Sequence, residues 1–272
     1  MVSDVEILEQ WLYGRAPLTQ KVYLRDVERA LRWLDSPSIE EISLGQLQQY
    51  QSHLISDRHD APATVNRKMS ALRSLLRFSH EQGWIDRNPA LALKSPKVHN
   101  NLHERTLTVE QVEAICNAAT TDRNRAFLRL AYATGARISE LCNLLWKDCK
   151  PKIDGSAVVW FLGKREKWRS VHVPTSAWFW VGRLRNGAPD DQRVFGVKVR
   201  QASDITKAAV LKAGAPAEAS THWFRHSTAS HSLDAGAPIS VVRDTLGHSS
   251  VAVTDRYLQG NPDKSAGDYL KL

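Results

Sequence analysis

Six side chains between positions 137 and 257 are of the types that phosphoryl transfer without a metal would require. They are one tyrosine, two arginines, two histidines and one lysine, namely Arg137, Lys164, His222, Arg225, His248 and Tyr257. A tyrosine hydroxyl can act as a nucleophile, arginines can bind phosphate oxygens, and histidine or lysine can carry protons. No cluster of carboxylates that would hold Mg²⁺ accompanies them. Together these types indicate chemistry at a phosphate, although each residue alone has an ordinary structural explanation.

Arg137 stands just before a predicted helix over residues 139–145 and follows a glycine, Gly135. A glycine lets the backbone approach another group closely, and the start of a helix attracts anions. An arginine there can bind a phosphate through two parallel hydrogen bonds. The same arginine could instead pair with Glu140, three residues later on the helix, and both interpretations stay open at this point.

Basic residues are concentrated in segment 163–169, which contains Lys164, Arg165, Lys167 and Arg169. The segment lies between two stretches rich in β-branched and aromatic residues, 156–162 and 170–174, so we predict a β-hairpin with a basic turn. A lysine at the tip of such a hairpin could reach into the minor groove of DNA and protonate a leaving oxygen. A solvated turn would explain the same composition.

His222 and Arg225 are three residues apart in a predicted helix and therefore share one of its faces. The histidines at positions 222 and 226 have the spacing of a zinc site, but Trp223 occupies the position where the H-E-x-x-H motif needs glutamate. No third ligand is apparent, so we predict no metal. His248 follows the end of another helix, and Tyr257, nine residues later, could equally be a packing residue.

A polar segment without apolar periodicity divides the chain. We predict an N-terminal domain over 1–97, a linker over 98–106 and a C-terminal domain over 107–272, which opens with a capping-box pattern at Thr108 and Gln111. Apolar spacing predicts helices in the first domain over 7–13, 22–34, 44–55 and 64–82. In the second domain, helices are predicted over 111–119, 123–133, 139–145, 203–213, 222–235, 239–246 and 251–258. The fold class is mostly α with a small antiparallel β-sheet, as an all-helical domain followed by a mixed α+β domain.

The predicted helix 64–82 combines an apolar stripe with four basic residues elsewhere on its surface, which are Arg67, Lys68, Arg73 and Arg77. An amphipathic helix with a basic exposed face suits the major groove of DNA. A solvated helix surface is the simpler explanation, and the sequence does not decide between the two.

The overall charge is positive and unevenly distributed. The chain has 37 Lys and Arg against 29 Asp and Glu, a formal net charge of +8, and 24 of the basic residues lie in 101–272. The excess fits a polyanionic partner but also simple solubility. No apolar run approaches the ~18–20 residues of a membrane span, and no export signal is apparent. Three cysteines without a C-x-x-C pair predict free thiols in a reducing compartment, which favours the cytoplasm.

These motifs resemble those of the tyrosine recombinases, the phage-integrase family. The resemblance rests on the order of Thr-Gly-Ala-Arg137-Ile-Ser-Glu-Leu, Gly-Lys164, Thr-His222-Trp-Phe-Arg225-His, Leu-Gly-His248-Ser-Ser and Thr-Asp-Arg-Tyr257. The segment from Thr64 to Ala90 also looks like the N-terminal core-binding domain of that family, which has a SAM-like helical fold. The resemblance therefore covers nearly the whole chain.

The resemblance implies a role for each of the six residues. Tyr257 would attack a DNA phosphodiester and form a 3′-phosphotyrosine, without ATP or another cofactor. Arg137 and Arg225 would bind the non-bridging oxygens, and His222 would exchange the tyrosine proton. Lys164 would be the general acid, and His248 would donate a hydrogen bond to the phosphate. Glu140 would support the site without reacting. Arg165 and Glu166 replace residues that are often small in relatives, so Lys167 stays a competing general acid, and Arg165 and Lys167 are expected to contact DNA.

The resemblance also implies partners. The expected substrate is double-stranded DNA with a short inverted-repeat site, bound by a homotetramer, or a heterotetramer with a paralogue, on two duplexes. With the first helix near Ile7 there is no room for an arm-binding domain, which favours the Xer-like branch, in dimer resolution or mobile-element integration and excision. The C-terminal segment after Tyr257 would dock on a neighbouring protomer or pack on its own. Alternatives are a DNA-binding relative without catalysis, a type IB topoisomerase-like enzyme and a metal-dependent nuclease.

Overall fold

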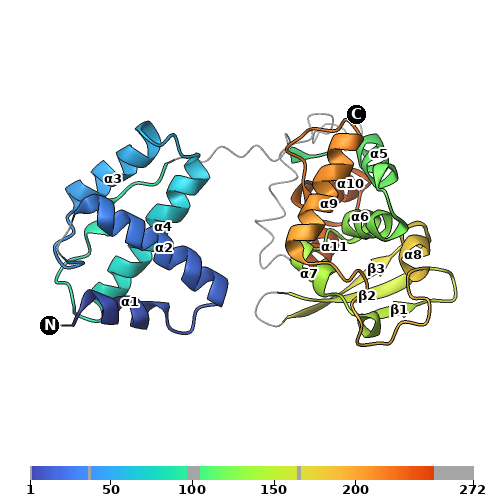
Figure 1. The fold of residues 1–272 in the computed structure, drawn as a ribbon, viewed down its shortest axis with the longest axis horizontal. Coiled ribbons are helices and arrows are strands. Elements are labelled where there is room, and N and C mark those ends of the chain that lie inside the picture. The colour runs from blue at the N-terminus through green and yellow to red at the C-terminus, as the bar shows by residue number, and fades with distance from the viewer. Residues whose placement is uncertain (1, 36–37, 97–104, 164–166, 248–272) are drawn as a thin grey trace, which may run out of the picture. The chain divides into compact units, whose positions relative to one another are not determined.

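The computed structural model describes residues 2–35, 38–96, 105–163 and 167–247. The chain forms two compact units, residues 1–100 and 101–272 (Figure 1). The first is helical and the second combines helices with one small antiparallel sheet, which confirms the predicted fold class. The predicted linker, 98–106, and the domain limits stay predictions, because residues 97–104 lie outside the described ranges.

The described part of the first unit contains four helices and a short 3-10 turn. They are α1 (Asp4–Leu12), α2 (Pro17–Leu34), α3 (Leu44–Ser56), α4 (Pro62–Glu81) and η1 (Pro89–Ala92). Capping boxes start α1 and α3, and a proline occupies the first turn of α2 and of α4, where its missing N–H costs nothing. The core of the unit is built around α4, whose apolar stripe, including Val65, Met69 and Leu72, is fully buried. All four helices predicted from apolar spacing are confirmed, with ends shifted by a few residues.

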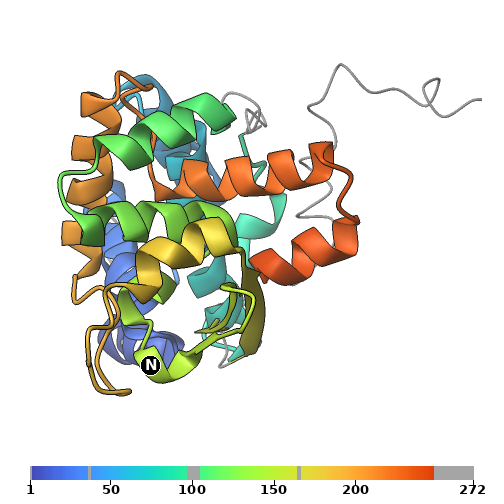
Figure 2. The ribbon, with the colours of Figure 1, turned by 90° about the vertical axis from the view of Figure 1, so that its right-hand side faces the viewer.

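The helices of the second unit are α5 (Val109–Ala118), α6 (Asp122–Thr134), α7 (Ile138–Asn143), α8 (Thr175–Gly182), α9 (Val199–Lys212), α10 (Thr221–Asp234) and α11 (Ile239–Leu246). A 3-10 turn, η3 (Trp146–Asp148), leads into the sheet. Figure 2 shows α10 running alongside α6, with α11 folded back from the end of α10. One apolar core joins α5 to α10 and the sheet, with Phe127, Phe161 and Phe224 among its fully buried residues.

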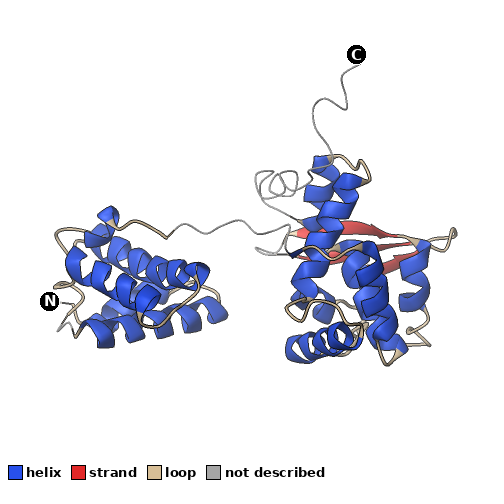
Figure 3. Cartoon of the chain, turned by 90° about the horizontal axis from the view of Figure 1, so that it is seen from above, coloured by secondary structure: helices blue, strands red, loops and turns tan. Residues whose placement is uncertain are grey.

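The sheet has three strands in the order β1 (Cys149–Pro151), β2 (Ala157–Leu162) and β3 (Trp168–Val173), all antiparallel (Figure 3). In the β2–β3 pair Val159 lies opposite Val171, and Phe161 lies opposite Arg169. Alternate residues of β2 face the core and are buried, as expected for a sheet with one covered face. The predicted hairpin is confirmed in its two strands.

Three differences from the predictions have physical reasons. β3 begins at Trp168 rather than at Ser170, because Trp168 and Arg169 pair with the end of β2. β1 was not predicted, since three residues are too few for a periodic signal. α8 was also missed, because its sequence is apolar almost throughout and has no amphipathic period. The helix predicted over 251–258 lies outside the described residues.

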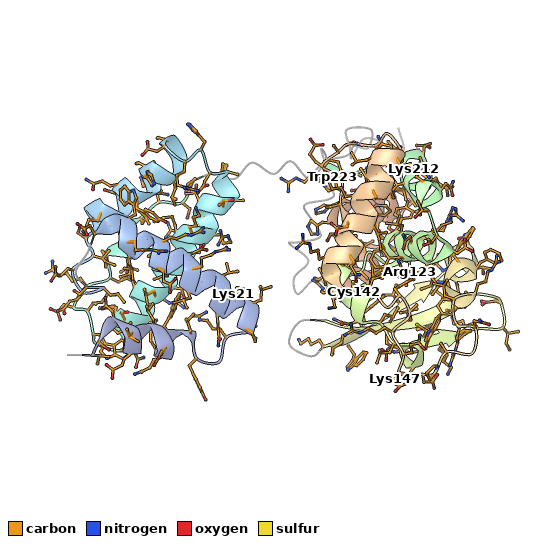
Figure 4. All side chains as sticks on the ribbon, viewed as in Figure 1. Lys21, Arg123, Cys142, Lys147, Lys212 and Trp223 are labelled. Atoms are coloured by element: carbon orange, nitrogen blue, oxygen red, sulfur yellow. The ribbon has the colours of Figure 1, made fainter. Side chains whose placement is uncertain are left out.

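The structure also bears on the predictions about membrane spans and cysteines. No helix within the described ranges is both long and apolar enough to cross a membrane. Cys116, Cys142 and Cys149 are buried free thiols, as predicted, and Cys142 is labelled in Figure 4. Burial raises the pKa of Cys116 and of Cys149 to about 12, so neither is a reactive thiolate at neutral pH.

Candidate active site

The turn between α6 and α7 carries Arg137 and requires the glycine before it. Gly135 caps α6 in the left-handed conformation, with φ 56°, which glycine adopts without strain. There is no space for a side chain, because a Cβ atom at this position would lie 2.4 Å from Cδ2 of Leu246. This close approach of α11 fixes the turn, and α7 begins directly after Arg137.

Glu140 binds two arginines with one buried carboxylate. Arg137 donates to it from Nη1, at 2.9 Å from Oε1, and from its backbone N–H, at 2.7 Å from Oε2. Arg169 of β3 donates from Nη1 to Oε1 at 2.9 Å and from Nη2 to Oε2 at 2.7 Å. Burial acts to raise the pKa of Glu140, but the hydrogen bonds and charge of Arg169, together with the hydrogen bonds of Arg137, lower it overall. Glu140 is therefore an anion that holds both arginines.

The pairing of Arg137 with Glu140 is compatible with phosphate binding. The pair occupies Nη1 and the backbone N–H of Arg137, while 34% of the side chain stays exposed. An arginine guanidinium carries five N–H donors, so one carboxylate contact leaves others to serve a ligand. The pairing with Glu140 is therefore confirmed, and phosphate binding by Arg137 stays a prediction.

Arg225 is buried in α10, with 3% of its surface exposed. Its Nη1 donates to the carbonyl oxygen of Gly135 at 2.6 Å, and its Nη2 donates to the carbonyl oxygen of Leu246 at 2.7 Å. These are carbonyls at the C-terminal ends of α6 and α11, where positive charge is favourable. Arg225 thus ties the turn that carries Arg137 to the end of α11.

His222 lies in the first turn of α10, three residues before Arg225, and is exposed to solvent. Partial burial of its ring, followed by the positive charges of Arg225, Arg105 and Arg137, lowers its pKa below the usual 6.5. The ring of His226 packs edge-on against it, with 4.3 Å between the ring centroids. An exposed, neutral imidazole among arginines can accept a proton near a bound anion.

The described residues thus bring together three of the six predicted site residues, Arg137, His222 and Arg225. Lys164, Arg165, His248 and Tyr257 lie outside the described ranges, and their roles stay predictions. Their neighbours in the sequence are described. Gly163 follows β2 and donates its N–H to the carbonyl of Lys167 at 2.8 Å, and Gly247 ends α11 in the left-handed conformation.

Comparison with known proteins identifies the family. Residues 105–264 match the model of the phage integrase family, and residues 10–86 match that of the phage integrase N-terminal SAM-like domain. The chain belongs to the phage integrase family. It is a tyrosine-type site-specific recombinase of the Xer-like branch.

Individual relatives agree with this assignment. The recombinase is 31% identical to tyrosine recombinase XerD of Vibrio vulnificus strain YJ016, across 94% of this chain and 91% of the relative. It is also 31% identical to tyrosine recombinase XerC of Xanthomonas campestris pv. campestris strain B100, across 88% of this chain and 77% of the relative. Its fold resembles that of a lambda integrase dimer bound to a COC′ core site, with a TM-score of 0.75 at 17% identity, over 97% of this chain and 79% of that one.

Two residues of the recombinase site were not singled out from the sequence. Arg169 was grouped with the basic turn, but it lies in β3 and shares the inward-facing side of the strand with Val171 and Val173. The signal that identifies Arg169 is its period-two spacing with Val171 and Val173, which applies only when the strand begins at Trp168. Arg105, whose charge acts on His222, precedes the predicted domain and carries no motif.

The basic residues of α4 do not form one exposed face of the helix. The predicted basic exposed face is therefore wrong in part. Lys68 is buried, with 6% exposure, and pairs with Asp60 at 2.5 Å. Arg67 pairs with the buried carboxylate of Asp26 on α2. The Lys68 ammonium therefore has a structural partner within the unit and is not presented for DNA.

The other two basic residues of α4 differ in exposure. Arg73 donates to Ser95 Oγ at 2.9 Å and to the carbonyl of Leu93 at 2.8 Å. Arg77 is the most open, with 72% of its side chain exposed and only a 3.5 Å contact with Glu81. Of these four basic residues, Arg77 has the most exposed side chain.

Proposed function

We propose that this recombinase cleaves and rejoins DNA through a covalent 3′-phosphotyrosine at Tyr257. The oxygen of Tyr257 would form a bond to phosphorus while the bond from phosphorus to the 5′-oxygen breaks. The tyrosine proton would go to His222, and the departing 5′-oxygen would take a proton from Lys164, with Lys167 as the competing donor. The reverse reaction with a partner strand rejoins the DNA, so no ATP is needed.

The arrangement of Arg137, His222 and Arg225 is the observation that carries this proposal. A tyrosine hydroxyl has an ordinary pKa near 10, so it needs a base at hand and a polarised phosphate. Partial burial and the nearby arginine charges lower the pKa of His222, which favours the neutral form that a proton acceptor needs. Arg137 and Arg225 would balance the charge that grows on the non-bridging oxygens, and His248 would donate a further hydrogen bond.

Glu140 would support the reaction without touching the phosphate. Its anionic carboxylate holds Arg137 at the contact described above and leaves part of that side chain exposed. In this scheme fixed cations take the place that metal ions occupy in other phosphoryl-transfer enzymes. The proposal therefore predicts full cleavage activity in EDTA.

The proposed substrate is double-stranded DNA with a short inverted-repeat site, bound by four protomers on two duplexes. Solved relatives include a lambda integrase tetramer bound to a Holliday junction and XerH bound to its difH substrate. The proposed assembly is a homotetramer of this chain or a heterotetramer with a paralogue. The reaction would take place in the cytoplasm. The biological role would be dimer resolution or the integration and excision of a mobile element.

The contacts with DNA outside the active site are proposed from charge and exposure. Arg77, Arg73 and Arg67 would follow the phosphate backbone from the first unit, and Arg165 and Lys167 from the second. Phosphate contacts of this kind supply affinity that falls as salt rises, without reading the base sequence. A charge reversal at an exposed contact should therefore weaken binding and reduce its salt dependence.

The test is the formation of a covalent complex on a nicked DNA that carries the recombination site. The nick lets the short 5′-end diffuse away, so the protein remains attached and migrates as a denaturant-resistant band. Wild-type protein should form this band in EDTA. Relaxation of supercoiled DNA without exchange between two sites would favour a topoisomerase-like enzyme instead, and loss of cleavage in EDTA would favour a metal-dependent nuclease.

A further inference from the structure

Three segments of the second unit meet at the side chain of Arg169. They are the N-terminal end of α7, which follows Arg137, the end of β2 at Gly163, and the C-terminal end of α11. In the sequence, Lys164 follows Gly163 and His248 follows Gly247. Arg169 therefore contacts the immediate surroundings of several predicted catalytic residues while itself lying in the sheet, away from the exposed surface.

The guanidinium of Arg169 has a partner for each of its three nitrogens. Nη1 and Nη2 bind the two oxygens of Glu140 in parallel, and Nε donates to the carbonyl oxygen of Thr245 at 2.9 Å. The group also stacks over Phe161, with 5.1 Å from its central carbon to the ring centroid, and the side chain is 10% exposed. A parallel pair of charge-assisted hydrogen bonds fixes direction as well as distance, which a lysine cannot reproduce.

The carboxylate of Glu140 transmits this fixed geometry to Arg137. The same two oxygens that accept from Arg169 also accept from the backbone N–H and Nη1 of Arg137. Without Arg169, Glu140 would lose two of its four described hydrogen bonds and could turn toward solvent. The guanidinium of Arg137 would then no longer be held at one position relative to the phosphate.

The end of α11 is held by two arginines in addition to a small apolar cluster. Its buried residues Val242 and Leu246 belong to a small cluster with Ala229 of α10, separate from the main core. Two consecutive carbonyls at its end accept hydrogen bonds, that of Thr245 from Arg169 and that of Leu246 from Arg225. Positive charge at a helix C-terminus is favourable, so the two arginines hold α11 where its chain continues to His248.

We propose that Arg169 is a positioning residue. It couples the position of α11 to the orientation of the Arg137 guanidinium at the phosphate. Both connections pass through one guanidinium, so α11 cannot leave its place without disturbing Glu140 and hence Arg137. The inference rests on the proposed function, because it assumes that Arg137 binds the scissile phosphate. It assigns to Arg169 no contact with DNA and no part in proton transfer.

The packing of Gly247 supports the same coupling. A Cβ atom at this position would lie 3.0 Å from Cδ and 3.3 Å from Nε of Arg169, so Gly247 lies directly against the arginine. On the other side, a Cβ at Gly163 would approach Nη1 of Arg169 at 3.9 Å and Oε1 of Glu140 at 4.0 Å. The two glycines allow the segments that lead to His248 and Lys164 to lie against the pair.

The experiment measures single-turnover cleavage of the nicked DNA at saturating protein, together with the DNA dissociation constant and the melting temperature. Arg169→Ala should slow cleavage about 10²-fold, the loss expected when a reacting group is misplaced by about an ångström. The DNA dissociation constant should stay within about threefold of the wild-type value, because Arg169 does not touch DNA.

Arg169→Lys should cleave less than about tenfold faster than Arg169→Ala, because a single ammonium cannot hold both Glu140 and Thr245. Arg183→Ala is the matched control, since Arg183 stacks on Phe179 in the same unit and should cleave as the wild type does.

A second comparison separates positioning from general support of the fold. In a background of Arg137→Lys, the additional loss from Arg169→Ala should shrink at least tenfold, because the guanidinium that Arg169 positions is already gone. All rates are taken well below the lowest melting temperature, and if R169A melts too low, R169K is used in its place. The same loss in both backgrounds, or wild-type cleavage by R169A, would overturn the inference. Failure of the proposed function looks different, because then the wild type forms no covalent complex or Tyr257→Phe still forms one.

Discussion

Arg225 donates a hydrogen bond to the carbonyl oxygen of Gly135 at 2.6 Å, so an arginine predicted to bind phosphate also fixes the turn that carries Arg137. The contact joins residues 90 positions apart and lies in a buried environment. Its partner bond, to the carbonyl of Leu246, extends the same support to α11. Arg225 therefore has a structural role, in addition to the phosphate-binding role proposed for it.

Replacement of Arg225 should affect cleavage and stability together. Arg225→Ala would leave two buried carbonyls without these donors, and an unsatisfied buried group costs about 1–3 kcal/mol. We expect the melting temperature to fall as well as the cleavage rate, in contrast to Arg137→Ala, where most of the loss should be in cleavage. Thermal unfolding followed by circular dichroism measures the first quantity. An unchanged melting temperature for R225A would contradict the structural role.

Gly135→Ala should destabilise the second unit by more than the strain of its backbone alone. A left-handed alanine costs about 1–2 kcal/mol, and forcing a methyl group into packed surroundings adds about 1–3 kcal/mol. The matched control is Gly214→Ala, which has a similar φ of 66° but open space around its Cβ position. Urea unfolding should show G135A as the less stable variant. Equal stabilities would mean that Leu246 can move aside freely.

The pH dependence of cleavage should reflect the lowered pKa of His222. In the proposed mechanism the neutral imidazole accepts the tyrosine proton, so the rate should fall as pH drops through its pKa, and that fall should lie below pH 6.5. Arg105→Gln removes one of the positive charges that lower this pKa, so the fall should move to higher pH. Arg183→Gln, which removes a charge elsewhere in the unit, should leave it in place. Single-turnover rates between pH 5 and pH 8 would test the shift, and identical profiles for wild type and R105Q would contradict it.

Lys68 and Arg77 of α4 should respond to substitution in opposite ways. Lys68→Met leaves the carboxylate of Asp60 without its buried partner, and we expect a loss of about 3 kcal/mol in unfolding free energy. Arg77→Glu is exposed and should leave the melting temperature unchanged while weakening DNA binding and flattening its salt dependence. Equilibrium binding at two or more salt concentrations, with unfolding of both variants, separates these effects. Unchanged DNA affinity for R77E would contradict a contact between Arg77 and DNA and leave Arg77 as an ordinary solvated residue.

Helix 62–81 shows both the reach and the limit of prediction from sequence. Its apolar stripe follows the 3.6-residue period, so the helix and its buried face could be predicted. The burial of Lys68 could not, because it depends on Asp60 in the preceding loop, and no periodic pattern reports such a pairing. A basic residue on a helix is a candidate for DNA contact only once its intramolecular partners are known.

The active site divides in the same way. Arg137, His222 and Arg225 could be named from residue type, spacing and family resemblance, since local chemistry determines which residue types are suitable. The contacts of Arg169 with Glu140 and Thr245 span 29 and 76 positions, and only the tertiary fold brings these segments together. The pKa of His222 also depends on charges from three separate parts of the chain.

The central claim is that the DNA becomes covalently attached to Tyr257. The most direct measurement identifies the residue that bears the attached nucleotide. The covalent complex formed on nicked DNA is digested with protease and nuclease, and the peptide that bears the nucleotide is identified by mass spectrometry. The chain has 6 tyrosines, and Tyr269 is the only other one after position 247, so Tyr269→Phe is the matched control. We predict the adduct on Tyr257, its loss in Tyr257→Phe and its persistence in Y269F. An adduct on any other residue, or one that survives in Y257F, would contradict the account.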